Sequence, residues 1–146
     1  MKIETIGNAQ FEAVLPLIAA YQEFYTQVPS LERNRTHFGQ YLTNHERGIL
    51  FGAFLDGKAI GFCTLYFLPS SLSGETMCVL NDIYTLPEYR GLGVARALLA
   101  ESRTYAKQRG FSNLEWWTAE SNAAAQRLYD QLGARRSAWY LYDLPT

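Results

Sequence analysis

The N-terminal third of the chain opens with alternation and then changes to helical spacing. Residues 2–6 alternate polar and apolar side chains, as a half-buried strand does. Apolar residues next recur at helical spacing over residues 11–21, where Pro16 is a candidate kink. Pro29 interrupts this pattern, and a second helix is predicted over residues 31–43. This part therefore predicts one strand followed by two helices.

The middle of the chain predicts three consecutive strands. Residues 49–55 and 59–67 are strand-like apolar runs, and the dipeptide Asp56-Gly57 between them is a strong signal for a tight hairpin. A loop rich in Ser and Gly follows, and residues 77–85 predict the next strand. Consecutive strands joined by tight turns are antiparallel.

The C-terminal third alternates helices and strands. Helical spacing over residues 93–109 is followed by a short strand predicted over residues 113–118. A second helix over residues 121–132 stops at Gly133, and residues 134–144 predict one or two further strands. Because strands separated by a helix tend to be parallel, the order predicts a mixed α/β sheet with helices on both faces.

Composition excludes several classes of protein. The chain has 146 residues, 48% of them hydrophobic, and a net charge of −1, which suits one domain over residues 1–146. Its 13 Lys and Arg residues are scattered, which argues against nucleic acid as a partner, since phosphate neutralisation supplies most of that affinity. The start lacks the pattern of a signal peptide, and the longest apolar run, residues 59–68, is too short to span a bilayer. We expect a cytoplasmic protein without a membrane partner.

The cysteines and histidines suggest no metal site. Cys63 and Cys78 stand in apolar strand-like runs, without the neighbouring Cys or His of a metal or redox motif. They are predicted to be buried free thiols. His37 and His45, in or beside the second helix, are assigned structural roles.

Candidate chemistry gathers where the fourth predicted strand meets the long helix. There Pro87 is followed by Arg90-Gly91-Leu92-Gly93-Val94-Ala95. The first N–H groups of a helix have no intrahelical partner, and glycines let phosphate groups approach the backbone. We expect a pyrophosphate on the N–H groups from Gly91 to Arg96, with Arg90 as a further phosphate contact. The loop lacks the Gly-Lys-Ser/Thr of a P-loop, and Arg96 replaces the third glycine of a dinucleotide fingerprint, so both of those sites are excluded.

This segment resembles the acetyl-CoA loop of the GNAT acetyltransferases, whose signature is Gln/Arg-x-x-Gly-x-Gly/Ala. A second block, Asn122-Ala123-Ala124-Ala125-Gln126-Arg127-Leu128-Tyr129, is similar to the family's Asn-x-x-Ala-x-x-Leu-Tyr helix. The two motifs and the element order together extend the resemblance over nearly the whole chain. It implies the GNAT fold, with six to seven mostly antiparallel strands around a central parallel pair and about four helices.

The resemblance also implies the transfer of acetyl from acetyl-CoA to an amine by direct attack. The pantetheine arm would pair with the backbone of Ile83, Tyr84 and Thr85, between two strands that splay apart. Asn122 matches the position that contacts the pantetheine. Tyr129, otherwise a core ring, would protonate the departing thiolate, for which a phenol with a reference pKa of about 10 is suited.

The acceptor and its base follow from the same resemblance. A carboxylate on the strand before the loop often helps to deprotonate the acceptor in relatives. Asp82 is the candidate here, with a structural hydrogen-bonding role as the alternative. Asn81 departs from the pair of adjacent acids found in some polyamine-acetylating relatives. The expected acceptor is a primary amine, a small polyamine or lysine-like amine; the alternatives are a protein or peptide N-acetyltransferase and a non-catalytic acyl-CoA-binding module.

Two aromatic segments resemble those of one subgroup of the family. Residues 115–122 and 139–142 look similar to fungal GNAT enzymes that acetylate polyamines and histone tails. Those relatives associate through their C-terminal strands. The resemblance therefore implies a homodimer through the predicted strands of residues 134–144.

Overall fold

A sheet of five strands in the order β1-β2-β3-β4-β5 forms the frame of the first 116 residues. The computed structural model describes residues 1–146, in two units, Met1–Trp116 and Trp117–Thr146. The elements of the first unit are β1 (Lys2–Thr5), α1 (Asn8–Phe24), α2 (Leu31–Gly39), β2 (Gly48–Leu55), β3 (Lys58–Pro69), β4 (Thr76–Thr85), the 3-10 turn η1 (Pro87–Tyr89), α3 (Val94–Gln108) and β5 (Leu114–Glu115). The sequence order of strands and helices predicted this mixed sheet.

The first four strands pair antiparallel, and β5 pairs parallel to β4. At the β2–β3 hairpin, Asp56 and Gly57 have φ angles of 49° and 81°, which is the left-handed backbone of a tight two-residue turn. The parallel pair is short, with only Cys78 opposite Leu114 and Val79 opposite Glu115. The predicted hairpin and the predicted parallel pair are both confirmed.

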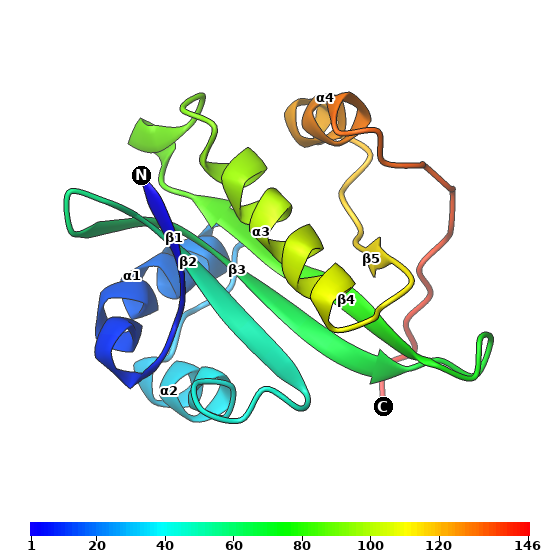
Figure 1. The fold of residues 1–146 in the computed structure, drawn as a ribbon, viewed down its shortest axis with the longest axis horizontal. Coiled ribbons are helices and arrows are strands. Elements are labelled where there is room, and N and C mark those ends of the chain that lie inside the picture. Colours follow the sequence, from blue (N-terminus) through cyan, green and yellow to red (C-terminus); the bar gives the residue numbers. More distant parts are fainter. The chain divides into compact units, whose positions relative to one another are not determined.

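Helices cover both faces of the sheet, with α1 and α2 on one face and α3 on the other (Figure 1). The face under α1 buries a core that includes Phe62 and Ile18. The face under α3 buries Leu98, and there Cys63 lies 3.4 Å, Sγ to Oγ, from Ser102. The chemistry described below lies on the α1–α2 face, at the end of β4 that leads into α3.

A bulge in β4 decides which residues reach that face. Thr64 pairs with Asp82 and the next residue, Leu65, pairs with Leu80, so Asn81 is the extra residue. Successive strand residues point to opposite faces, and the bulge reverses this alternation. Asp82 is therefore buried on the α1–α2 face, while Asn81 is exposed.

Several element boundaries differ from the sequence predictions. The first helix continues through Pro16 without a break, and α2 ends at Gly39 instead of residue 43. The strand predicted over residues 113–118 shrinks to β5, and residues 134–144 form no strand. The sheet accordingly has five strands instead of six or seven, because an apolar alternation becomes a strand only where a neighbouring strand accepts its hydrogen bonds.

The second unit contains the helix α4 (Ala123–Gln131). The Asn122 side chain accepts a hydrogen bond from the backbone N–H of Ala125 at 3.3 Å and caps this helix. Gly133, with a φ angle of 75°, follows the end of the helix in the left-handed conformation usual there. No helix of the chain has the length and apolar character that a membrane crossing requires.

Candidate active site

The glycine loop has the geometry of an anion site. Gly91 and Gly93 have φ angles of 79° and 80°, in the left-handed region that favours glycine. A Cβ added at either position would meet no other atom within 4 Å, so backbone conformation, and not crowding, accounts for these glycines. Gly93 caps α3, and the first N–H groups of a helix have no intrahelical partner. Of the predicted residues, Gly91, Leu92 and Gly93 form the turn before α3, and Val94, Ala95 and Arg96 begin the helix.

Arg90 holds the loop against the end of β4. Its Nε donates to the carbonyl oxygen of Thr85 at 3.3 Å. The guanidinium carbon lies 5.7 Å from the ring centre of Phe24 and 5.9 Å from that of Tyr84, within cation–π range. Arg90 therefore links the end of α1, the end of β4 and the glycine loop.

One edge of β4 is open beside this loop. On one side β4 pairs with β3 along its whole length, from Thr76 to Thr85. On the other side β5 pairs only with Cys78 and Val79. Backbone groups beyond Val79, including those of Ile83, Tyr84 and Thr85, thus have no strand beside them. This is the edge at which an extended ligand can add backbone hydrogen bonds.

Asp82 is a buried carboxylate in which only one of the two oxygens accepts a hydrogen bond of ordinary geometry. Its side chain is only 5% exposed, and its Oδ1 accepts a hydrogen bond from Asn81 Nδ2 at 3.1 Å. Oδ2 is buried without a hydrogen-bond partner of ordinary geometry, and so is the Oγ1 of Thr64 on the paired strand. A buried polar atom without a partner is costly, and such atoms often mark a place where a ligand binds.

Burial raises the pKa of the Asp82 carboxyl above its ordinary value. Asn81 and the hydroxyls of Tyr21 and Thr64 lie near enough to oppose this increase, and a positive charge on His37 opposes it further. Burial and the charge of Asp82 in turn raise the pKa of Tyr21 well above its usual range, so this phenol stays protonated. A carboxylate whose pKa is shifted towards neutrality is suited to take a proton at physiological pH.

Aromatic rings line the face around Asp82. Tyr21 from α1 lies 5.9 Å from Phe62 and 6.2 Å from Tyr84, ring centre to ring centre, in edge-to-face packing. Such rings attract a cation through their faces. Rings and carboxylate together can receive a protonated amine.

The structure also brings together two residues that the sequence did not connect. His37 Nε2 and the Tyr66 hydroxyl oxygen lie 2.7 Å apart, although α2 and β3 are far apart along the chain. Tyr66 stands on the same face of β3 as Thr64. No local pattern signals this pair, because each residue alone fits an ordinary structural role.

Tyr129 and Asn122 belong to the second unit. Tyr129 is half-buried on α4, and Asn122 caps the start of that helix. Helical geometry places them about two turns apart along α4. The roles of Tyr129 as an acid and of Asn122 as a pantetheine contact stay predictions.

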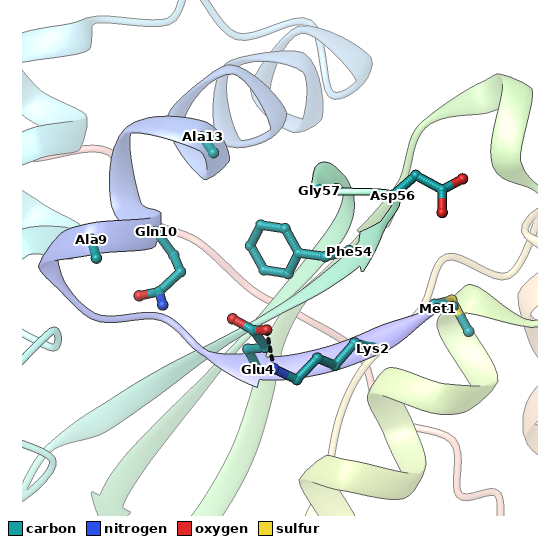
Figure 2. Close-up of a pocket in the computed structure, with 9 residues that line it drawn as sticks. All are labelled: Met1, Lys2, Glu4, Ala9, Gln10, Ala13, Phe54, Asp56 and Gly57. Carbon is teal, nitrogen blue, oxygen red and sulfur yellow. Dashed lines mark ion pairs between the residues drawn. The ribbon is translucent and has the colours of Figure 1, made fainter.

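Two surface hollows are lined by residues other than Asp82. One, of about 510 Å³, is bordered by β1, α1 and the β2–β3 hairpin. Figure 2 shows the Phe54 ring directed into it, with Lys2 and Glu4 at its border joined by an ion pair of 2.7 Å. These two charges therefore neutralise each other. The other hollow, of about 560 Å³, lies along α2 and includes His37.

The buried thiols fit the prediction for Cys63 and Cys78. Both are free and buried. Burial raises the pKa of Cys63 to about 12 and that of Cys78 to about 11. No group of three or more His, Cys, Asp or Glu side chains gathers in an arrangement that could hold a metal ion.

Comparison with known proteins agrees with the geometry. The Acetyltransferase (GNAT) family matches residues 14–134. The chain is 33% identical to the uncharacterized N-acetyltransferase YhfO of Bacillus subtilis (strain 168), over 97% of this chain and 95% of that protein. It is 34% identical over 76 residues to a thialysine N-epsilon-acetyltransferase of Sus scrofa, which covers 52% of this chain and 44% of that protein.

Among solved structures, one described as a probable acetyltransferase superposes with a TM-score of 0.87 at 30% identity, over 100% of this chain and 98% of that one. The fold, the glycine loop and these matches agree with each other. The chain therefore belongs to the GNAT family of acetyltransferases.

Proposed function

We propose that this enzyme transfers acetyl from acetyl-CoA to a small primary amine, a polyamine or lysine-like amine, with Asp82 as the general base. The observation that carries the proposal is the buried Asp82 carboxylate, whose Oδ2 has no hydrogen-bond partner of ordinary geometry and which shares its sheet face with Phe62 and Tyr84. A thialysine N-epsilon-acetyltransferase among the relatives supports an amine acceptor of this kind.

Acetyl-CoA would bind along the loop and the open edge of β4. The N–H groups from Gly91 to Arg96 would bind its pyrophosphate, because the first N–H groups of a helix have no intrahelical partner and lie at the positive end of the helix dipole. Arg90 would add charge beside the phosphates. The backbone of Ile83, Tyr84 and Thr85 would pair with the pantetheine at the edge that β5 leaves uncovered.

The transfer then needs three proton movements. Asp82 Oδ2 takes a proton from the acceptor ammonium, and the neutral amine attacks the thioester carbonyl. The C–N bond forms and the C–S bond breaks. The CoA thiolate takes its proton from the Tyr129 phenol, and the second proton that the attacking nitrogen loses restores that phenol. Asn122 would contact the pantetheine. Binding both reactants beside a positioned base removes most of the entropic cost of their encounter.

Tyr129→Phe and Asp82→Asn test the two roles in one assay. CoA release would be followed with a thiol reagent, over acceptors that include spermidine, putrescine, free lysine, an aminoglycoside and a basic peptide. Each substitution should lower kcat by about 10²- to 10⁴-fold, the usual contribution of a proton-transfer group. Turnover confined to the basic peptide would favour a protein N-acetyltransferase. If no acceptor is acetylated but acetyl-CoA still raises the Tm, a non-catalytic binding module is favoured.

Homodimerisation through the C-terminal segment is a separate part of the proposal. The C-terminal segment exposes Trp139, Tyr140 and Leu141 to 82%, 90% and 95%. Single exposed apolar residues are ordinary, but several in one short run make a contiguous apolar patch of the kind that marks an interaction surface. Covering them with a second copy would bury this apolar surface. Sedimentation velocity at micromolar concentration tests the idea, with Trp139→Ser as the weakened variant; a monomer mass for the unmodified chain would count against it.

A further inference from the structure

A line of polar side chains leads from Asp82 to the surface of α2. Next to Asp82, Thr64 is its direct partner on β3, and Tyr66 follows two residues later on the same face. The Tyr66 hydroxyl oxygen lies 2.7 Å from His37 Nε2. His37 itself is exposed. Four residues from three elements thus lie in series on one face of the sheet, from the buried Asp82 to the exposed His37.

At the Asp82 end of this line, two polar atoms are buried without a hydrogen bond of ordinary geometry. Asp82 Oδ2 and Thr64 Oγ1 are both buried without a hydrogen-bond partner. Two such atoms on adjacent strands can share one water molecule. Burial, and after it the charge of Asp82, raise the pKa of Tyr66. Burial likewise raises the pKa of Asp82, and a charge on His37 opposes that increase, so the three groups lie within electrostatic reach of each other.

The outer end opens on the hollow along α2. His37 lines this hollow together with Glu32, Arg33, Thr36 and Gln40. An imidazole changes its charge near neutral pH and can exchange protons with water. His37 is therefore the side chain of the line that is able to release a proton.

Other groups facing Asp82 offer no equivalent route. From α1, Tyr21 approaches the carboxylate, and the rings packed on it include Tyr25 at 5.1 Å and Tyr84 at 6.2 Å between ring centres, both of them phenols. Tyr41, after α2, packs on Tyr66 at 5.3 Å between ring centres. Asn81 on β4 has no titratable proton. Tyr41 also packs on His37, at 5.8 Å between ring centres, but only Tyr66 has its hydroxyl within hydrogen-bond distance of the imidazole.

We propose that Tyr66 and His37 carry to solvent the proton that Asp82 takes from the acceptor, so that the base is reset before the next turnover. The inference rests on the proposed function of Asp82. The Asp82 O–H bond breaks, and its proton passes to Tyr66 through one water molecule held by Thr64. The Tyr66 O–H proton moves at the same time to His37 Nε2, and the imidazolium releases one proton to water. Carboxylate, phenol and neutral imidazole are restored, and no electrons are transferred.

Chemical rescue tests the outer step. His37→Ala should lower kcat about tenfold or more in weakly buffered solution, and added imidazole should restore it with saturating dependence on concentration. His45→Ala, the same change at the other histidine, should leave kcat and its buffer dependence as in the unmodified enzyme. A His37→Ala enzyme with full kcat, or a loss that imidazole does not restore, would overturn the proposal.

The phenol is tested by a matched pair. Tyr66→Phe keeps the ring and removes the hydroxyl, so kcat should fall and imidazole should not restore it. Tyr41→Phe makes the same change in the ring that packs on Tyr66 and should leave kcat unchanged. Equal kcat values for Tyr66→Phe and the unmodified enzyme would exclude the hydroxyl from the route.

A measurement without turnover separates this proposal from the proposed function. In ¹³C NMR of labelled aspartate, His37→Ala should move the Asp82 titration to higher pH, because a positive neighbour that lowers its pKa is lost. An unchanged titration would overturn the coupling. If the unmodified chain acetylates no amine, the proposed function fails and this proposal fails with it; if it turns over normally and the variants match it, this proposal alone fails.

Discussion

Asp82→Asn should change stability and activity in opposite directions. In the unmodified protein a buried carboxylate keeps Oδ2 without a partner, at a cost to the folded state. The new amide would be uncharged, and its Nδ2 could donate to Thr64 Oγ1, which is also unpartnered. Above neutral pH we expect the free energy of unfolding to rise by about 0.5–2 kcal/mol, the range of single stabilising substitutions.

The raised pKa of Asp82 determines how the stability difference between the variant and the unmodified protein should change with pH. Because burial raises the pKa of Asp82, the folded state binds more protons than the unfolded state between the ordinary and the raised pKa. The stability contributed by this group therefore falls as pH rises through that interval. The variant has no such group, so its advantage should be smallest at acidic pH and largest above the raised pKa.

Urea unfolding at several pH values, with Tm as a second readout, measures the effect; each kcal/mol corresponds to about 2–4 °C in a domain of this size. Asp143→Asn, the same change at an exposed position, is the control and should alter neither stability nor kcat. In the CoA-release assay Asp82→Asn should lose about 10²- to 10⁴-fold in kcat. A variant less stable than the unmodified protein above neutral pH, with kcat retained, would refute the reasoning and leave Asp82 a structural residue.

Three further predictions concern the loop, the thiols and a surface ion pair. Gly93→Ala should lower the free energy of unfolding by about 1–2 kcal/mol in urea, because its φ of 80° is unfavourable for a residue with a Cβ; unchanged stability would contradict this. Cys63 and Cys78, with pKa values of about 12 and 11, should resist a thiol reagent in the native protein and react after unfolding; fast labelling of the native protein would disagree. Glu12→Gln should leave the Tm almost unchanged, because the ion pair with Arg35, though only 2.7 Å long, is exposed and screened by water; a clear fall in Tm would show a role beyond that pair.

Local signals in the sequence determined the turns and the candidate anion site. Asp56-Gly57 forms the predicted hairpin turn, and Asn122 caps the predicted helix. Gly91 and Gly93 adopt the left-handed backbone before α3 that a phosphate-binding turn needs. These features could be predicted because each depends on the φ and ψ angles and hydrogen bonds of a few neighbouring residues.

Strand formation at the C-terminal end could not be predicted in the same way. Residues 113–118 and 134–144 have strand-like composition, but only Leu114–Glu115 pairs with another strand. The backbone hydrogen bonds of a strand belong to a partner that is distant in sequence. A strand-like pattern therefore indicates only a preference for the extended conformation. Tertiary packing decides whether those residues pair with another strand.

The tertiary structure also decided which polar residues meet on the α1–α2 face. From the sequence, Asp82 was a candidate base and His37 was assigned a structural role. The bulge at Asn81 directs Asp82 towards Thr64, and the packing of α2 on β3 brings His37 to Tyr66. The sequence by itself determined the family motif and the glycine loop, because those lie in contiguous residues. Only the tertiary structure decided the register that buries Asp82 and the contact between α2 and β3, because both depend on free energies summed over residues far apart in the chain.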